Sequence, residues 1–288
     1  MQTVEDFTEY KILDLKDGRK LESWNGFILD RPDPEVIWPS INNANWNSFH
    51  AKYERSSKGG GAWENRSVPS SFQIHYHELT FNLKLMGFKH TGLFPEQAYN
   101  WNKIEDVIKK SKRNVKVLNL FAYTGGASIA ALSAGASVVH VDSSKGMVDW
   151  AKENVQASNL GDKPIRFIVD DVKKFVKREI RRGNKYDIII MDPPSFGRGS
   201  SGEVWDIEKD LYSLVEDCTL LLSEKPLMFL INSYTTGLSM SVLSNILKLT
   251  VCKKYNGNIK TDELGLKVEN SDIVLPCGIF ARWEKDKG

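Results

Sequence analysis

Residues 115–128 read VKVLNLFAYTGGAS, an apolar strand that ends in a turn with two adjacent glycines, followed by small residues. Further along the chain, apolar strands and helical segments alternate, which is typical of a parallel sheet built from βαβ units. The sequence therefore predicts an α/β fold. We expect strands over residues 115–121, 137–142, 165–171, 186–192, 227–232 and 278–283, and helices over 128–134, 144–157, 172–181, 207–222 and 240–249.

The preceding residues, from 10 to about 92, have the pattern of a β-rich region. Lys16-Asp-Gly-Arg19 separates two strand-like stretches, and an Asp-Gly pair supplies the left-handed backbone that a tight hairpin needs. Over 72–85 apolar and polar residues alternate with one change of parity, which predicts another hairpin or a bulged strand. We expect two domains, 1–91 and 92–288.

Residues 42–71 predict a loop because they are mostly polar and contain three consecutive glycines, Gly59 to Gly61. The loop also carries Trp46 and Trp63. Two interpretations remain open: a flap that contacts the substrate, or a loop that its two tryptophans anchor.

The composition restricts the function. The chain has 288 residues, a formal net charge of +2 and three widely spaced cysteines. A large cationic surplus, which is typical of proteins that wrap nucleic acid electrostatically, is absent. The odd, scattered cysteines predict neither a disulfide framework nor a metal site, and they favour a reducing compartment. The beginning of the chain does not resemble a signal peptide and no apolar run is long enough to span a membrane, so we expect a cytoplasmic protein.

Polar or glycine residues follow each of the first four predicted strands of the α/β region. Gly125 and Gly126 follow the first strand, where a ligand can approach the backbone at the start of a helix. The turn does not match the G-x-G-x-x-G pattern of dinucleotide sites. Asp142 ends the second strand and can accept both hydroxyls of a ribose. Asp170 and Asp171 end the third, where one is expected to cap the next helix and the other to meet an adenine amino group.

Asp192-Pro-Pro-Ser-Phe196 follows the fourth strand. Two prolines fix the backbone and remove two N–H donors, so carbonyls and the Asp192 carboxylate are expected to act as acceptors beside an aromatic ring. This arrangement suits a planar amine or a base, whereas the simpler interpretation is a rigid turn. All four segments lie at the carboxyl ends of parallel strands, where open α/β sheets bind ligands.

These motifs together resemble those of the class I S-adenosylmethionine-dependent methyltransferases. The chain is most similar to the bacterial branch that contains 23S ribosomal RNA large-subunit methyltransferases acting on cytosine C5 and on guanine. Gly92-Leu-Phe-Pro-Glu-Gln97 is similar to the segment that precedes the fold in that branch. The resemblance covers about residues 92–283. It implies a Rossmann-like seven-stranded methyltransferase sheet with a small N-terminal β-rich domain, which would recognise the substrate.

The resemblance also implies a role for each motif residue. Tyr123, Thr124, Gly125 and Gly126 would surround the methionine moiety of S-adenosyl-L-methionine, and Asp142 would hold its ribose. Asp171 or Asp170 would bind the adenine. Asp192 would lie between the methyl donor and the acceptor. Pro193 and Phe196 would shape the acceptor pocket, and Phe94 and Gln97 would close the cofactor pocket.

The chain departs from the cytosine-C5 members in one respect. Those enzymes use a cysteine thiolate, which adds to carbon 6 of the ring, whereas residues 232–238 and the Asp192 motif contain no cysteine. Cys218 and Cys252 are expected in the core, and Cys277 could reach the site only if the last strand lies close to the fifth. A nitrogen acceptor is therefore favoured, because it needs only an aligned lone pair and a fixed donor.

The acceptor is expected to be ribosomal RNA, with no metal and no membrane involved. Two basic clusters, 109–116 and 173–185, suggest phosphate contacts, although much of both should lie at the amino-terminal edge of the sheet and they can also be simple solvated faces. In the N-terminal region, tryptophans and tyrosines together with Lys52, Arg55, Lys58 and Arg66 could hold single-stranded bases. The alternatives are a small-molecule or protein N-methyltransferase, or a non-catalytic RNA-binding protein that keeps the fold.

Overall fold

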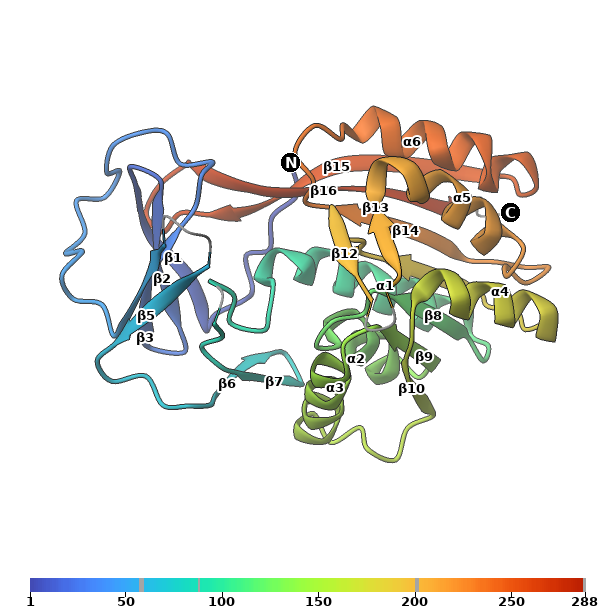
Figure 1. Cartoon of the computed structure of the whole chain (residues 1–288), viewed down its shortest axis with the longest axis horizontal. Coiled ribbons are helices and arrows are strands. Elements are labelled where there is room, and N and C mark those ends of the chain that lie inside the picture. The colour runs from blue at the N-terminus through green and yellow to red at the C-terminus, as the bar shows by residue number, and fades with distance from the viewer. Residues whose placement is uncertain (57–59, 88, 200–201, 287–288) are drawn as a thin grey trace. The chain divides into compact units, whose positions relative to one another are not determined.

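The computed structural model describes residues 1–56, 60–87, 89–199 and 202–286, and the chain divides into two units (Figure 1). The first unit contains Met1–Tyr99 and Gly265–Cys277, and the second contains Asn100–Leu264 and the residues from Gly278 onward. The units do not follow the expected boundary, because residues 92–99 and 265–277 pack with the N-terminal region. A role of residues 1–91 in substrate recognition stays a prediction.

The first unit is built on a five-stranded sheet in the order β1-β2-β3-β4-β5. Its strands are β1 (Tyr10–Lys16), β2 (Arg19–Trp24), β3 (Phe27–Pro32), β4 (Ala51–Arg55) and β5 (Gly61–Asn65). The hairpin expected between β1 and β2 is confirmed, with Asp17 and Gly18 at positive φ in its turn. The second expected hairpin is also confirmed: β6 (Phe72–Tyr76) pairs antiparallel with β7 (Leu79–Leu83) around His77.

The prediction of a loop over residues 42–71 is wrong in part, because β4 and β5 lie within it and pair antiparallel. Tyr53 and Trp63 face each other across this pair, with ring centroids 5.3 Å apart. The indole N–H of Trp63 donates to the Met86 carbonyl and that of Trp46 to Asp14, so both tryptophans anchor the segment. Lys58 and Gly59 lie outside the described residues.

The second unit contains the expected seven-stranded sheet, in the order β10-β9-β8-β11-β14-β16-β15. Strands β8 to β11 and β14 run parallel, and β16 is antiparallel to β14. The elements that the sequence predicted are found with small changes of boundary: β8 (Lys116–Leu120), α2 (Gly126–Ser133), β9 (Ser137–Asp142), α3 (Lys145–Ala157), β10 (Ile165–Val169), α4 (Val172–Arg182), β11 (Ile188–Met191), α5 (Ile207–Thr219), β14 (Met228–Ser233) and α6 (Met240–Leu249).

Several elements of the chain have no counterpart among the predicted ones. Helix α1 (Ala98–Ser111) buries Trp101, Ile104 and Ile108, whose helical spacing is a signal that was available. The strand expected over 278–283 is part of the longer β16 (Val274–Lys285), and β15 (Gly257–Lys267) has too polar a pattern to be recognised. The other missed elements are η1 (Pro95–Gln97), η2 (Val251–Lys253), β12 (Phe196–Arg198) and β13 (Val204–Asp206).

The two faces of the large sheet differ in what they bury. Helices α4, α5 and α6 cover one face with an apolar core that includes Leu120, Phe175 and Leu214. Helices α2 and α3 pack on β8, β9 and β10. Alternate residues of β8 and β9 point to that second face, among them the polar side chains Asn119 and His140. In the described parts of the chain, no helix is long and apolar enough to cross a bilayer.

Candidate active site

The carboxyl ends of four neighbouring strands bring the predicted motifs of the second unit to one edge of the sheet. Leu120 at the end of β8 pairs with Val141 of β9 and with Met191 of β11, and Asp142 pairs with Val169 of β10. The segments that follow these strands contain Tyr123 to Gly126, Asp142, Asp170, Asp171 and Asp192. The sheet order therefore places next to one another motifs that are up to 70 residues apart in sequence.

The turn after β8 has an unusual backbone. Phe121 and Tyr123 have φ of 53° and 51°, values that are uncommon for residues other than glycine, and Gly125 has φ of 94° at the N-cap of α2. Such strain is found at functional sites more often than elsewhere. The positive φ at position 125 requires a glycine there. A Cβ on Gly126 would lie 2.7 Å from Cζ2 of Trp101, so close packing also accounts for the second glycine.

Asp142 joins two of the loops at this edge. Its Oδ2 accepts from the backbone N–H of Tyr123, and its Oδ1 accepts from the backbone N–H of Ser144, both at 2.9 Å. Burial raises the pKa of Asp142, and these backbone hydrogen bonds act against that shift. The backbone N–H of Ser143 is a third donor to this carboxylate. A carboxylate has about four acceptor positions, so it can still accept from a ribose hydroxyl.

In the third motif, the prediction that one aspartate caps the next helix is confirmed. Asp171 is the N-cap of α4, and its Oδ1 accepts from the N–H of Lys174 at 2.9 Å. The carboxylate of Asp170 forms an ion pair with Arg178, in the second turn of the same helix. Both carboxylates have a partner within the protein, so an adenine amino group would have to share one carboxylate with that partner. Which aspartate binds the adenine stays a prediction.

The Asp192 motif differs from the expectation in its carbonyl groups. The Pro194 carbonyl accepts from the Trp205 indole at 2.6 Å and the Ser195 carbonyl accepts from the N–H of Ile207, so neither carbonyl projects as a free acceptor. The reason is the unpredicted β12–β13 hairpin, whose chain folds back onto the motif. Pro193 is buried, Asp192 is half-buried, and the Phe196 ring is 56% exposed.

Three polar contacts that sequence reasoning missed support the loops. The hydroxyls of Ser195 and Thr235 lie 2.7 Å apart and connect the Asp192 motif with the segment after β14. Asn154 of α3 donates to the Thr124 carbonyl at 2.9 Å. The hydroxyl of Ser128 contacts Nδ1 of His140 at 3.0 Å.

His140 stays neutral near pH 7, because burial lowers its pKa to about 3. The contact of His140 with Ser128 had one signal in the sequence. His140 is a polar residue inside an otherwise apolar strand, and a buried polar side chain needs a hydrogen-bond partner.

Burial disfavours the thiolate form of the three cysteines. Burial raises the pKa of the Cys218 thiol, which is fully buried in the core of the second unit, and raises that of Cys252 as well. The condition set for Cys277 is met, because β16 pairs with β14 and Ile279, two residues after Cys277, lies opposite Ser233. Burial raises the pKa of the Cys277 thiol strongly. Over the described ranges, no three His, Cys, Asp or Glu side chains form a group that could hold a metal.

Two of the predicted cofactor residues, Phe94 and Gln97, belong to the first unit. Phe94 is the N-cap residue of η1, and Gln97 ends this helix with 8% of its surface exposed. The ring of Phe94 lies 5.5 Å from that of His90. Their part in closing the cofactor pocket stays a prediction.

Comparison with known proteins identifies the class. A family model described as S-adenosylmethionine-dependent methyltransferase matches residues 48–245, and the chain belongs to this family. S-adenosyl-L-methionine is therefore its cofactor. A methyltransferase crystal structure from Agrobacterium tumefaciens, described as SAM-dependent, is 32% identical with a TM-score of 0.92, and the match covers 99% of this chain and 93% of that one.

More particular similarity is found among curated relatives. A "Ribosomal RNA large subunit methyltransferase K/L" from Colwellia psychrerythraea is 29% identical over 204 residues, which are 69% of this chain and 28% of the relative. A "Ribosomal RNA large subunit methyltransferase I" from an Enterobacter species is 34% identical over 134 residues, 46% of this chain and 33% of the relative. The chain thus spans a third or less of the length of these relatives.

Proposed function

We propose that this protein transfers a methyl group from S-adenosyl-L-methionine to a nitrogen of a ribosomal RNA base. The observation that carries the proposal is the single sheet edge that holds the strained turn after β8, the Asp142 carboxylate and the Asp192 motif. The names of the curated relatives support ribosomal RNA as the acceptor.

The proposed cofactor site uses the first three motifs. Tyr123, Thr124, Gly125 and Gly126 surround the methionine moiety, and Asp142 accepts the ribose hydroxyls while it holds the turn in place. Asp171 or Asp170 accepts a hydrogen bond from the adenine amino group. Phe94 and Gln97 close the site. When bound, the cofactor supplies an electrophilic methyl group on a positively charged sulfur.

The proposed acceptor site is formed by the Asp192 motif. Asp192 would accept a hydrogen bond from the acceptor N–H and orient the nitrogen lone pair. It would take up this proton as the nitrogen–carbon bond forms and the sulfur–carbon bond breaks. The buried Pro193 fixes the backbone, and the exposed ring of Phe196 offers a stacking surface for a base. Most of the rate enhancement then comes from proximity and orientation.

A nitrogen acceptor agrees with the positions of the cysteines. Carbon 5 of a cytosine becomes nucleophilic only after a thiolate adds to carbon 6. Burial raises the pKa of all three thiols, which disfavours the thiolate, and Cys218 is enclosed in the apolar core. These observations support methylation of a ring or exocyclic nitrogen.

Two substitutions test the roles of the carboxylates. We expect Asp142→Ala to weaken binding of S-adenosylhomocysteine by about tenfold or more, because charge-assisted hydrogen bonds are lost. Asp192→Ala should bind it like the wild type and lose methyl transfer. Isothermal titration and labelled methyl transfer to ribosomal subunits, naked RNA and cell extract measure these effects. Asp149→Ala, an exposed carboxylate on α3, is the matched control.

Each result has a clear interpretation. Full activity of Asp192→Ala would remove the acceptor-site assignment. Transfer to a small molecule or a protein in the extract, but not to RNA, would replace the proposed acceptor. If the wild type does not bind S-adenosylhomocysteine at all, the enzyme proposal fails.

A further inference from the structure

The amino-terminal edge of the large sheet, opposite the predicted active site, contains a crevice of about 310 Å³. It lies where β8, β9 and β10 begin: Lys116, Ser137 and Ile165 are the first residues of these strands and all three line it. The segment between α4 and β11 forms another wall through Asn184, Lys185 and Tyr186. The crevice is thus built entirely from the second unit.

The floor and the rim of this crevice differ in chemistry. Val138, Val139 and Tyr186 are each at least nine-tenths buried and give it an apolar floor, while Lys116, Arg166 and Lys185 surround it with positive charge. A shallow apolar surface with cations at its rim suits a planar aromatic group that carries an anion.

The nearby acidic groups have other partners. The carboxylate of Glu179 accepts from the Tyr186 hydroxyl at 2.5 Å and from Asn184 at 2.7 Å, and it pairs with Arg182. Asp187 accepts from the backbone N–H of Lys116 and pairs with Arg113.

The rim cations, by contrast, are only partly neutralised. Burial acts to raise the pKa of Glu179, but its hydrogen bonds and the nearby charge of Arg166 lower it, so Glu179 offsets part of the Arg166 charge. Within the part of the chain that the structure describes, the side chains of Lys116 and Arg166 form no ion pair, and Lys185 donates to the Leu220 carbonyl. The rim therefore keeps positive charge that a ligand can neutralise.

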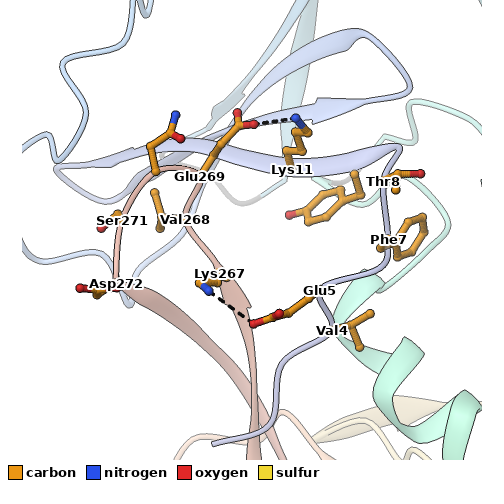
Figure 2. A pocket seen from close by; sticks show the side chains of 12 residues that line it. Val4, Glu5, Phe7, Thr8, Lys11, Lys267, Val268, Glu269, Ser271 and Asp272 are labelled. Carbon is orange, nitrogen blue, oxygen red and sulfur yellow. Dashed lines mark hydrogen bonds and ion pairs between the residues drawn. The ribbon is translucent and has the colours of Figure 1, made fainter.

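In two other basic regions, most cations have an acidic partner. The larger pocket of the first unit, about 720 Å³, contains two lysines, but Lys11 pairs with Glu269 and Lys267 with Glu5 (Figure 2). On the exposed face of α4, Lys173 pairs with Asp210 and Lys174 with Glu203, in addition to the pair of Arg178 with Asp170. The charges of these five cations are balanced within the protein, whereas Lys177 and Arg181 of α4 form no ion pair within the described parts of the chain.

We propose that the crevice at the amino ends of β8, β9 and β10 is a nucleotide-binding site, with an aromatic base on the apolar floor and a phosphate on Lys116 and Arg166. The nucleotide is either a free mononucleotide or part of an RNA chain. Asn184 and Ser137 provide an amide and a hydroxyl that can contact the edge of the base. Only the RNA case rests on the proposed function.

Charge reversal tests this site without disturbing the core, because Lys116 and Arg166 are exposed. Lys116→Glu and Arg166→Glu are compared with Lys248→Glu, which reverses an equally exposed charge on α6. The probes are AMP, GMP, CMP and UMP, measured by isothermal titration, and a short single-stranded RNA oligonucleotide, measured by fluorescence anisotropy at several salt concentrations.

We expect wild type and Lys248→Glu to bind alike and each crevice variant to bind about tenfold more weakly or worse. Weakened mononucleotide binding assigns the site to a free nucleotide. Weakened RNA binding, with a salt slope lower by about one and no mononucleotide binding, assigns it to an RNA chain. The proposal is overturned if the wild type binds neither probe, or if the crevice variants bind as Lys248→Glu does.

Titration of S-adenosylhomocysteine provides the separate readout for the enzyme. All three variants should bind it like the wild type, because the predicted cofactor residues lie at the opposite ends of the strands. Failure of methyl transfer to RNA in the wild type would contradict the proposed function and leave a positive mononucleotide result standing.

Discussion

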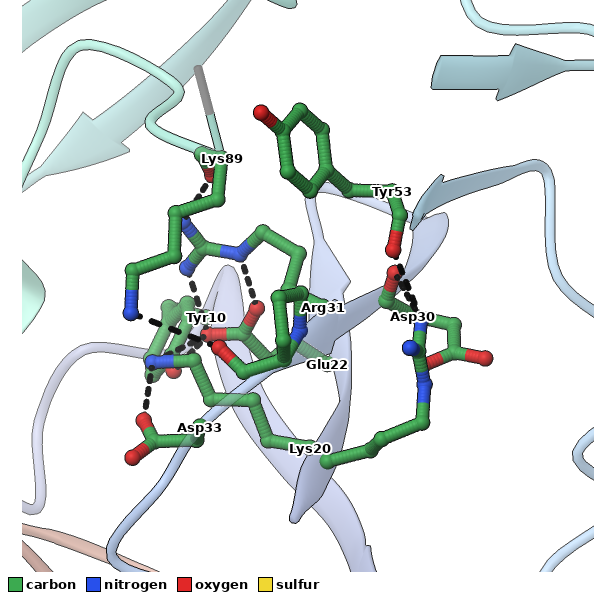
Figure 3. Close-up of polar contacts among 10 residues, drawn as sticks. Tyr10, Lys20, Glu22, Asp30, Arg31, Asp33, Tyr53 and Lys89 are labelled. Carbon is green, nitrogen blue, oxygen red and sulfur yellow. Dashed lines mark hydrogen bonds and ion pairs between the residues drawn. The ribbon is translucent and has the colours of Figure 1, made fainter. Parts of the chain in front are cut away.

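The first unit buries charged side chains in the middle of its sheet, whereas the central strand β11 of the second unit buries only Ile188, Ile189, Ile190 and Met191. Figure 3 shows the charged group of the first unit, which we call the Glu22 cluster: Tyr10, Lys20, Glu22, Arg31, Asp33 and Lys89. The middle of the first sheet therefore adds buried ion pairs to apolar burial, whereas β11 is stabilised by apolar burial. Apolar burial tolerates acid, and a buried ion pair does not.

The Glu22 cluster is held by short hydrogen bonds. Arg31 donates to both carboxylate oxygens of Glu22, at 2.6 and 2.8 Å, and the Tyr10 hydroxyl donates to one of them at 2.6 Å. Lys20 lies 3.6 Å from Glu22 and 3.2 Å from Asp33. Glu22 thus compensates the buried Arg31, and it shares the charge of Lys20 with Asp33.

Loss of this carboxylate should give the largest effect. Glu22→Ala leaves Arg31 buried without its partner, and we expect it to reduce the free energy of unfolding by about 3–5 kcal/mol. Glu64→Ala removes an exposed pair with Arg66 in the same sheet and should change it by less than about 1 kcal/mol. Chemical denaturation measures both, and equal effects would show that the cluster contributes no more than a surface pair.

Acid should destabilise the first unit before the second. Burial acts to raise the pKa of Glu22, but Arg31 and Lys20 outweigh it and lower the pKa to about 2 from an ordinary 4.5. Because the folded pKa is depressed, this contribution to stability is complete above about pH 4.5 and is lost as the pH falls towards 2. The effect should be smaller than that of Glu22→Ala, since the side chain keeps its volume and a neutral hydrogen bond.

The indole NMR signals of Trp24 and Trp283, each fully buried in its own unit, report on the two units separately. As the solution is acidified, the Trp24 signal should disappear at a higher pH than the Trp283 signal. Glu22→Gln should make the loss of the Trp24 signal less dependent on pH. Loss of both signals at the same pH in the wild type would contradict the expectation that the first unit is the more sensitive to acid.

In the second unit the sensitive feature is close packing. Gly126→Ala would place its Cβ 2.7 Å from the Trp101 ring, and we expect a loss of about 1–3 kcal/mol because the turn or the ring must move. A double-mutant cycle with Trp101→Phe should recover part of the loss. Additive effects in denaturation experiments would show that the contact is not the cause.

The smallest change is expected at a glycine without such a neighbour. Gly146 lies near the start of α3, and its nearest contact for a Cβ would be 3.9 Å away. Gly146→Ala should stabilise the second unit by about 0.5–1 kcal/mol, because alanine loses less entropy in a helix. A destabilisation measured by thermal unfolding would show that α3 does not tolerate a side chain there.

Much of the second unit was predictable because its signals are local. Apolar runs such as 186–192 and the alternation of strands with helices define a parallel sheet, and such a sheet must bring its strand ends to one edge. The order of the motifs along the chain therefore predicted their grouping in space. The cap at Asp171 was predicted for the same reason, since it depends on residues only three positions apart.

The rest depends on contacts between distant residues. The β12–β13 hairpin redirects the Pro194 and Ser195 carbonyls, and it could not be foreseen from the two prolines alone. β4 and β5 stand in what reads as a glycine-rich loop, because pairing of Tyr53 with Trp63 overrides local composition.

The sequence by itself determined the parallel strands of the large sheet and the edge at which the predicted site lies, because strand periodicity and turn signals are properties of neighbouring residues. The resemblance of its short motifs to a known family gave the cofactor class. Tertiary structure alone decided that Gly126 makes room for Trp101, that Glu22 compensates buried cations, and that Lys116 and Arg166 border one crevice. Packing and electrostatic compensation depend on which distant side chains share a volume, and periodicity carries no information about that.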